Sequence, residues 1–378
     1  MRAIHTCLTL TLMAMLSACG GSNEPTSTQT AAAPAALPSA PSLAQKSSNN
    51  CPAANGDISF LCGPLNAEDI LRIGNSELLL ASGMAGNPDI NGRLHLINSR
   101  DRSWEVLFPS PATTFAHDAA MYPNCPGPLD TAKLSLHGVA LQNYPAGSSK
   151  YRLYMTSHGT REAIETFTLD TAAAKPALTW TGCVPLPADV WANSVVILPD
   201  GGFMTTKFID AGAGGMQALR EGKLNGYVLE WHPGGDVRVI TGTELSGPNG
   251  IDVSADGRYL YVAAFGGNAI VRYDLSVMPP AKTEIAVGVV PDNVRWTDKG
   301  TLLTAGRNTA TGCTRADGTE CGPGWSVFEI DPATLQAHRI AGMAVNEAMP
   351  TVSTAYVMGK DIWIGTPAGD KVAIATTP

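Results

Sequence analysis

The stretch GPNGIDVSADGRYLYVAA, residues 247–264, decides the fold. Apolar and polar residues alternate on both sides of the Asp256-Gly257 turn, and this pattern is a strong signal for a β-hairpin. A further alternating run follows at residues 269–275, AIVRYDL. The stretch therefore predicts a unit of antiparallel strands joined by tight turns.

The same plan recurs along the chain, which indicates a repeat protein. Five further copies begin EDIL, HGVAL, NSVVIL, DNVRW and TAYV, at residues 68, 137, 193, 292 and 354. This spacing fits four strands per unit, and six such units can close a ring without free edges. We therefore expect an all-β fold, a six-bladed β-propeller over residues 51–378. A short helical stretch at residues 212–226 interrupts the third unit and predicts an insertion above one face, where it would act as a lid.

Composition supports many short strands and narrows the choice of partner. The chain has 39 Gly, 27 Pro and a net charge of −8. The negative charge, without a basic stripe, argues against nucleic acid as a partner. A small-molecule partner is expected instead, and the sequence does not indicate an oligomeric state.

The N-terminus is typical of a bacterial lipoprotein. An apolar run ends in Leu16-Ser17-Ala18-Cys19, so residues 1–18 are interpreted as a signal peptide and Cys19 as the lipidated residue. Residues 19–50 are small and polar and predict a disordered tether. We expect a protein held by lipid at the periplasmic face of the outer membrane. The alternative is an ordinary secretory signal that leaves a soluble periplasmic or secreted protein.

Cysteine usage fits an oxidising compartment. Six cysteines remain after Cys7 and Cys19, and they allow 15 pairings. Short loops favour Cys51–Cys62 and Cys313–Cys321, which leaves Cys125–Cys183. A zinc site is disfavoured, because the chain has no C-x-x-C pair.

Polar residues stand at the start of five of the six predicted inner strands. These residues are Glu68, His137, Asn193, Asn249 and the pair Asp292-Asn293. The same position in five blades must lie near one axis if the ring closes. Grouped carboxylate and amide oxygens would be costly without a partner, and oxygen ligands favour a hard cation, so the sequence predicts Ca²⁺.

Taken in order, these motifs resemble the calcium-dependent six-bladed propellers of the paraoxonase/arylesterase and gluconolactonase (senescence-marker-protein-like) superfamily. The likeness covers roughly residues 62–375 and implies that calcium is held by Glu68, Asn193, Asn249, Asp292 and Asn293. His137, in His137-Gly138-Val139, and His158 resemble the family's catalytic histidines. The family's second, structural calcium would use Asp69 and the carbonyl of Val139, but Ser194 stands where the family has an Asp for that ion.

The resemblance implies a calcium-dependent hydrolase of lactones or aryl esters. His137 would be the general base and His158 would orient it, although Asp292 or the metal is an open alternative for activating the water. The alternative function is a non-catalytic propeller that binds a ligand or protein partner and uses calcium structurally. A structural ion needs the oxygen ligands but not the two histidines, and the presence of both favours hydrolysis.

Overall fold

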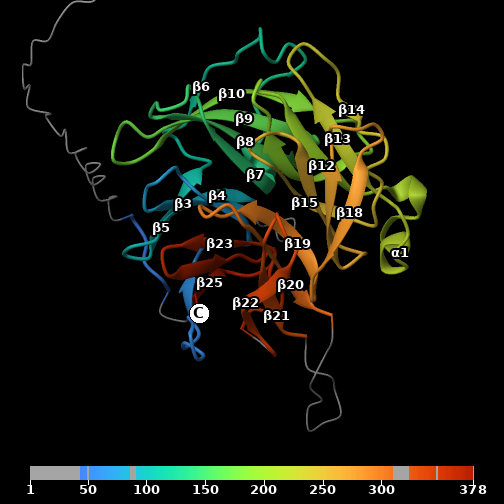
Figure 1. The fold of residues 1–378 in the computed structure, drawn as a ribbon. Coiled ribbons are helices and arrows are strands. Elements are labelled where there is room, and N and C mark those ends of the chain that lie inside the picture. The colour runs from blue at the N-terminus through green and yellow to red at the C-terminus, as the bar shows by residue number, and fades with distance from the viewer. Residues whose placement is uncertain (1–42, 49–50, 86–90, 310–322, 346–347, 378) are drawn as a thin grey trace, which may run out of the picture. The chain divides into compact units, whose positions relative to one another are not determined.

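Each repeat forms one antiparallel sheet in the computed structural model, which describes residues 43–48, 51–85, 91–309, 323–345 and 348–377. These residues form six sheets. The inner strand of each sheet contacts the inner strand of the next, and the last contacts the first, which closes a six-bladed β-propeller (Figure 1). The inner strands are β2 (Ala67–Arg72), β7 (Ser135–Asn143), β11 (Trp191–Ile197), β15 (Pro248–Val253), β19 (Val289–Trp296) and β23 (Ala355–Met358).

The remaining strands follow outward from the inner strand of each sheet. The first sheet adds β3 (Leu78–Gly83), β4 (Arg93–Asn98) and β5 (Ser103–Phe108). The second adds β8 (Lys150–His158), β9 (Ala163–Asp170), β10 (Ala177–Pro185) and the short β6 (Thr114–Phe115). The third adds β12 (Phe203–Ile209), β13 (Tyr227–Trp231) and β14 (Arg238–Val239), and the fourth adds β16 (Tyr259–Ala264), β17 (Ala269–Asp274) and β18 (Ala281–Ala286). The fifth adds β20 (Leu302–Asn308), β21 (Trp325–Ile330) and β22 (Ala337–Met343).

The sixth sheet closes the ring by joining distant parts of the chain. Its strands are β23, β24 (Asp361–Ile364), β25 (Lys371–Thr376) and β1 (Ile58–Cys62), which precedes the first sheet in sequence. β1 pairs with β25 from Ile58 opposite Ala375 to Cys62 opposite Lys371. This pairing joins a strand from before the first sheet to the last strand of the chain, and it closes the ring through backbone hydrogen bonds.

Burial explains which strands read as apolar runs and which alternate. Strand β3, between an inner strand and β4, is buried at every residue of its sequence LLLASG. Strand β18, on the outer edge of the fourth sheet, is exposed at every residue except Ile285. Middle strands are covered by the neighbouring blades on both faces, whereas outer strands meet water.

The segment before β1 packs on the propeller. Leu43 is buried and its amide donates to Ser103 Oγ at 2.8 Å, and Gln45 forms a β-bridge with Trp104. The Cys51–Cys62 disulfide, with Cα atoms 5.6 Å apart, holds the chain at the end of β1. The tether predicted for residues 19–50 therefore does not extend through residues 43–48, because Leu43 and the bridge at Gln45 anchor them.

The helical insertion lies in the third blade, as predicted. The 3-10 turn η2 (Ala211–Ala213) and helix α1 (Gly215–Arg220) lie between β12 and β13, and α1 contacts β12 (Figure 1). A further 3-10 turn, η1 (Thr131–Lys133), precedes β7. Within the described ranges, no helix has the length and apolar character needed to cross a membrane.

The two disulfides that the structure describes are Cys51–Cys62 and Cys125–Cys183, and both were predicted. The predicted Cys313–Cys321 pair, the signal peptide and the lipidation site Cys19 lie outside the described residues.

Candidate functional site

The polar residues predicted at the starts of the inner strands lie at irregularities of five of these strands. Each of these strands loses regular pairing with its neighbour at the residues in question, namely Glu68 in β2, His137-Gly138 in β7, Asn193-Ser194 in β11, Asn249-Gly250 in β15 and Asp292-Asn293 in β19. A β-bulge takes a residue out of the ladder and re-aims its side chain. The pairing of β23 is regular, and this strand contributes no comparable group.

Glycine follows two of these anchors because neighbouring inner strands approach closely there. A Cβ atom added to Gly138 would lie 2.5 Å from the Cα atom of Ser194, and one added to Gly250 would overlap Asn293. Only glycine fits such a backbone approach. The His-Gly and Asn-Gly motifs therefore reflect the packing that brings the anchors of adjacent blades together.

We refer to Glu68, Asn193, Asn249, Asp292 and Asn293 as the oxygen cluster. Asn293 Nδ2 donates to Glu68 Oε1 at 2.8 Å, and the Asn249 side chain hydrogen-bonds Asp292. Asn193 Nδ2 lies 3.1 Å from His137 Nε2, which is in turn 3.7 Å from Glu68 Oε1. The structure thus brings all five predicted ligands to one place, together with His137.

Four oxygens of the cluster are buried without a hydrogen-bond partner. They are Glu68 Oε2, Asn193 Oδ1, Asn249 Oδ1 and Asn293 Oδ1. A buried acceptor without a partner costs about 1–3 kcal/mol, and such groups are rare in native proteins. One hard cation would satisfy all four, and this oxygen-only set is of the kind that Ca²⁺ accepts.

The pKa values of the two carboxyl groups in the oxygen cluster also indicate that it suits a cation. Burial, followed by the charges of Asp292 and Asp69, raises the pKa of Glu68 well above its usual value. Burial and the nearby Asp69 raise the pKa of Asp292 to about 8, although the Asn249 hydrogen bond opposes the shift. The cluster therefore disfavours negative charge unless a positive charge accompanies it.

Asparagine amides make up most of the donor set of the oxygen cluster. Among the residues that the structure describes, no group of three or more His, Cys, Asp or Glu side chains is arranged to hold a metal ion. The candidate centre depends on three asparagine amides, whose oxygens are suitable for calcium but poor ligands for zinc.

His137 and His158 form a hydrogen-bonded chain beside the oxygen cluster. His137 Nδ1 lies 3.0 Å from His158 Nε2, and His158 Nδ1 lies 2.9 and 2.8 Å from the two carboxylate oxygens of Glu162. His137 is the third residue of β7 and His158 is the last residue of β8, so their proximity follows from the hairpin, as the sequence predicted.

The hydrogen bonds assign the direction of this chain. Glu162, as a carboxylate, accepts, so His158 donates from Nδ1 and its Nε2 accepts from His137 Nδ1. The lone pair of His137 Nε2 then faces the oxygen cluster. Burial, with a smaller contribution from His158, lowers the pKa of His137 well below its usual value, which keeps this nitrogen unprotonated near neutral pH.

Glu162 is a site residue that the sequence analysis missed. It lies in the turn between β8 and β9, where a glutamate in Gly159-Thr160-Arg161-Glu162 looks like an ordinary surface residue. Its position four residues after His158 was the available signal, but the turn conformation that folds it back was not readable from the sequence.

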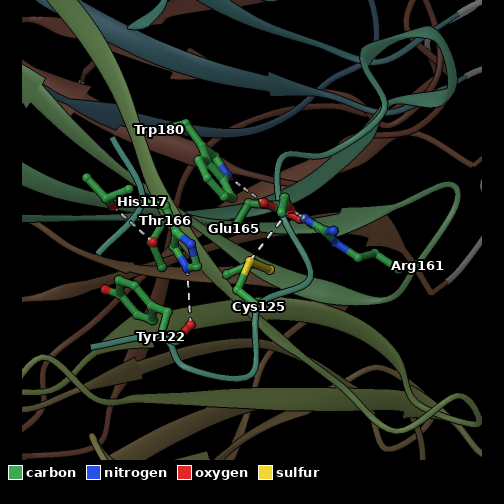
Figure 2. The surroundings of a disulfide bond; sticks show 10 residues. His117, Tyr122, Cys125, Arg161, Glu165, Thr166 and Trp180 are labelled. Carbon is green, nitrogen blue, oxygen red and sulfur yellow. Dashed lines mark hydrogen bonds and ion pairs between the residues drawn. A yellow bond between two sulfur atoms is a disulfide. The ribbon is translucent and has the colours of Figure 1, made fainter. Parts of the chain in front are cut away.

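The turn that carries Glu162 is fastened from the outer side of the blade. Figure 2 shows Glu165 accepting hydrogen bonds from Arg161 and from Trp180, near the Cys125–Cys183 disulfide. Arg161 also donates to the carbonyl of Gly127 at 2.9 Å. The disulfide loop and the buried Glu165 therefore hold both sides of the turn.

An aromatic surface lies beside the histidines. Trp191, at the start of β11, is 39% exposed, and its ring centroid lies 5.6 Å from that of His158 and 6.2 Å from that of His137. Phe208 packs against Trp191 and against Phe265, with centroid distances of 5.8 and 5.5 Å. An apolar contact surface thus adjoins the candidate base.

Asp69 and Val139, predicted for a second ion, also lie together. Val139 N donates to Asp69 Oδ2 at 2.9 Å. Both residues, however, are engaged by Arg295, which the sequence analysis did not place in the site.

Comparison with known proteins shows the fold. No family model matches the chain, and no curated protein resembles it significantly in sequence. Among solved structures, a luciferin-regenerating enzyme is 13% identical with a TM-score of 0.50, over 83% of this chain and 92% of that one. A gluconolactonase from Xanthomonas campestris is 17% identical with a TM-score of 0.48, over 90% of this chain and 99% of that one. A virginiamycin B lyase from Staphylococcus aureus is 13% identical with a TM-score of 0.47, over 85% of this chain and 99% of that one. The six-bladed β-propeller of this chain is thus similar to the structure of the luciferin-regenerating enzyme, at an identity that establishes the fold alone.

Proposed function

We propose that this protein is a calcium-dependent hydrolase of lactones or aryl esters, similar to the paraoxonase and gluconolactonase group. The observation that carries the proposal is the hydrogen-bonded chain Glu162–His158–His137, which ends at a cluster of buried oxygens without partners. A purely structural ion would need the oxygens but would not need an aligned pair of histidines beside them.

The oxygen cluster would hold the ion. Glu68 and Asp292 supply negative charge, and Asn193, Asn249 and Asn293 supply amide oxygens. When bound, calcium would polarise the carbonyl of the substrate and stabilise the negative charge that develops on its oxygen.

His137 is the proposed general base. Its Nε2 lone pair would accept a proton from water as the water oxygen attacks the carbonyl carbon of the ester or lactone. The bond between the carbonyl carbon and the alkoxy or aryloxy oxygen then breaks, and the leaving oxygen takes up the proton from His137. Asn193, within hydrogen-bond distance of the same nitrogen, would position the reacting groups.

His158 and Glu162 are proposed as positioning residues. His158 Nε2 fixes the tautomer of His137 by accepting a hydrogen bond from its Nδ1–H group, and the Glu162 carboxylate stabilises the positive charge that the two rings share after His137 takes a proton from water. A carboxylate that orients an imidazole in this way contributes through charge and tautomer, without taking the proton itself.

The aromatic surface beside the histidines supports a substrate with an apolar acyl or aryl group. Trp191, partly exposed beside the histidines, would contact the acyl or aryl part of an ester while the polar reacting group faces the oxygen cluster. Aromatic side chains provide a large apolar contact area that suits such groups.

The test is a panel of lactones and aryl esters, assayed with excess calcium and after removal of calcium by a chelator. We expect hydrolysis that depends on calcium and falls about 10²–10⁴-fold in His137→Gln, while calcium affinity changes little. His117→Gln is the matched control, because His117 is exposed on the loop between β6 and β7.

A chelator-insensitive activity, or near wild-type turnover in His137→Gln, would contradict the proposed mechanism. Calcium binding without any hydrolysis across the panel would favour the alternative, a ligand-binding propeller with a structural ion.

A further inference from the structure

A buried arginine crosses the propeller axis next to the oxygen cluster. Arg295 follows Asn293 by two residues on β19 and is only 7% exposed. Its Nε donates to Asp69 Oδ1 at 3.0 Å, its Nη2 forms an ion pair with Asp69 Oδ2, and the same Nη2 donates to the carbonyl of Val139 at 2.8 Å. One guanidinium thus connects inner strands of the first, second and fifth blades.

Asp69 and Val139 supply the two oxygen groups that the sequence had predicted for a second ion. In this structure neither group lacks a partner. Asp69 Oδ2 accepts from Val139 N as well as from Arg295, and Asp69 Oδ1 also lies 3.3 Å from the hydroxyl of Thr354 on the sixth blade. Of the residues at this second position, Ser194 Oγ is buried without a partner, whereas Asp69 and the carbonyl of Val139 are both engaged by Arg295. The carboxylate and the carbonyl that an ion would need are therefore occupied, and the second position does not fit a metal ion.

The charges around Asp69 also disfavour a metal ion at the second position. A cation placed here would be repelled by the guanidinium that already pairs with the carboxylate of Asp69. A planar guanidinium that binds a carboxylate through two donors has both the charge and the geometry for this position. Burial acts to lower the pKa of Arg295, but the charges of Asp69 and Asp252 outweigh it and raise that pKa.

We propose that Arg295 is the resident cation at the second position on the axis, and that it takes the place of a structural metal ion there. The chain then binds at most the one ion of the oxygen cluster, and its ring is held at this level by a side chain rather than by calcium. The count of one ion rests on the proposed function, whereas exclusion of an ion at Asp69 does not.

A route exists for an ion to reach this position if the guanidinium is removed. Arg295 lines a cavity of about 320 Å³ at the ends of the inner strands away from the oxygen cluster. Gln142, Asp252 and Tyr356 lie in the same lining. Replacing Arg295 with serine would open space between this cavity and the carboxylate of Asp69.

The experiment counts calcium ions on the full-length protein by native mass spectrometry and follows thermal unfolding with and without millimolar calcium. Arg295→Ser is expected to bind one ion more than wild type. Its Tm without calcium should fall by roughly 6–10 °C, since breaking a buried ion pair leaves Asp69 uncompensated. Calcium should restore more of this loss than it adds to wild type.

Arg295→Lys is the matched variant, because it keeps a positive charge but loses the two-donor geometry. It should bind the same number of ions as wild type and unfold at a temperature between those of wild type and Arg295→Ser. Asp69→Asn in the wild-type background should leave the ion count unchanged, because Asp69 binds Arg295 and not a metal.

The proposal is overturned if Asp69→Asn loses an ion that wild type holds. It is equally overturned if Arg295→Ser gains no ion, or if calcium at any concentration fails to recover its fold. A wild-type protein that binds no calcium would refute the proposed function alone, and the Arg295 proposal would still require a gain of one ion in Arg295→Ser.

Discussion

Raising the pH from 6 to 8 should destabilise the calcium-free protein, and bound calcium should remove most of this effect. The reason lies in Asp292, whose pKa burial raises to about 8 in the folded, calcium-free protein. In the unfolded chain the same carboxyl has a pKa near 3.9. The folded state therefore holds this proton more tightly than the unfolded state does.

The sign and size of the effect follow from proton linkage. Stability gained from the raised pKa is fully present below pH 4 and is lost as the pH rises through 8. Between pH 6 and pH 8 the unfolded carboxyl is ionised throughout, while the folded one goes from almost fully to about half protonated. At about 1.36 kcal/mol per pKa unit, the free energy of unfolding should fall by about 2 kcal/mol over this interval. The raised pKa of Glu68 acts in the same direction.

Calcium binding should release the proton, because the ligand carboxylates must be ionised. Isothermal titration in buffers of different ionisation enthalpy counts the protons released. We expect about one proton from Asp292 at pH 6 and about half of one at pH 8. Urea unfolding at both pH values, with calcium and after its removal, measures the stability change.

Asp292→Asn is the control, because it keeps the size and the oxygen ligand but cannot titrate. It should bind calcium more weakly and release less proton at pH 6 than wild type does. If wild-type protein releases no proton at pH 6, or if the gap in stability between the calcium-bound and calcium-free forms is the same at both pH values, the reasoning is wrong.

Three further variants test the surroundings of the site. Glu162→Gln should lower kcat roughly 10²-fold with little change in KM or calcium affinity, because the charge that orients and stabilises His158 is lost. Steady-state kinetics measure this effect, with the surface variant Glu221→Gln as control. An unchanged kcat would show that Glu162 does not act in the site. Replacing Cys125 and Cys183 with serine should lower the free energy of unfolding by about 4 kcal/mol, given their 58-residue separation, and should also reduce kcat. Replacing Cys51 and Cys62 with serine should reduce stability but not kcat. Equal kcat in the two double variants would contradict the proposal that the Cys125–Cys183 loop supports the turn of Glu162. Trp191→Ala should raise KM for aryl esters more than it lowers kcat, and an unchanged KM would exclude this ring from the substrate surface.

The fold and the oxygen cluster could be predicted from the sequence because they depend on local, repeated patterns. Alternating apolar residues around Asp256-Gly257 predict a hairpin wherever they occur, and six loosely spaced copies of this plan favour a closed ring. Closure of the ring also assembles the site, because residues at the same register of the inner strands, such as Asn193 and Asn249, must then lie near one axis. The proximity of His137 and His158 required only that their two strands form a hairpin.

Other parts of the site were decided by tertiary structure alone. Glu162 reaches His158 because a turn folds it back, and that conformation depends on contacts from Arg161 to the distant loop that holds Cys125. The sequence could predict that Asp69 lies near the axis, but not that a partner already satisfies its charge. Arg295, 226 residues later in the chain, meets Asp69 only because the ring brings β19 next to the inner strands around it. Periodicity specifies which residues share a register, whereas the occupant of a buried position depends on long-range packing and charge balance that no local pattern encodes.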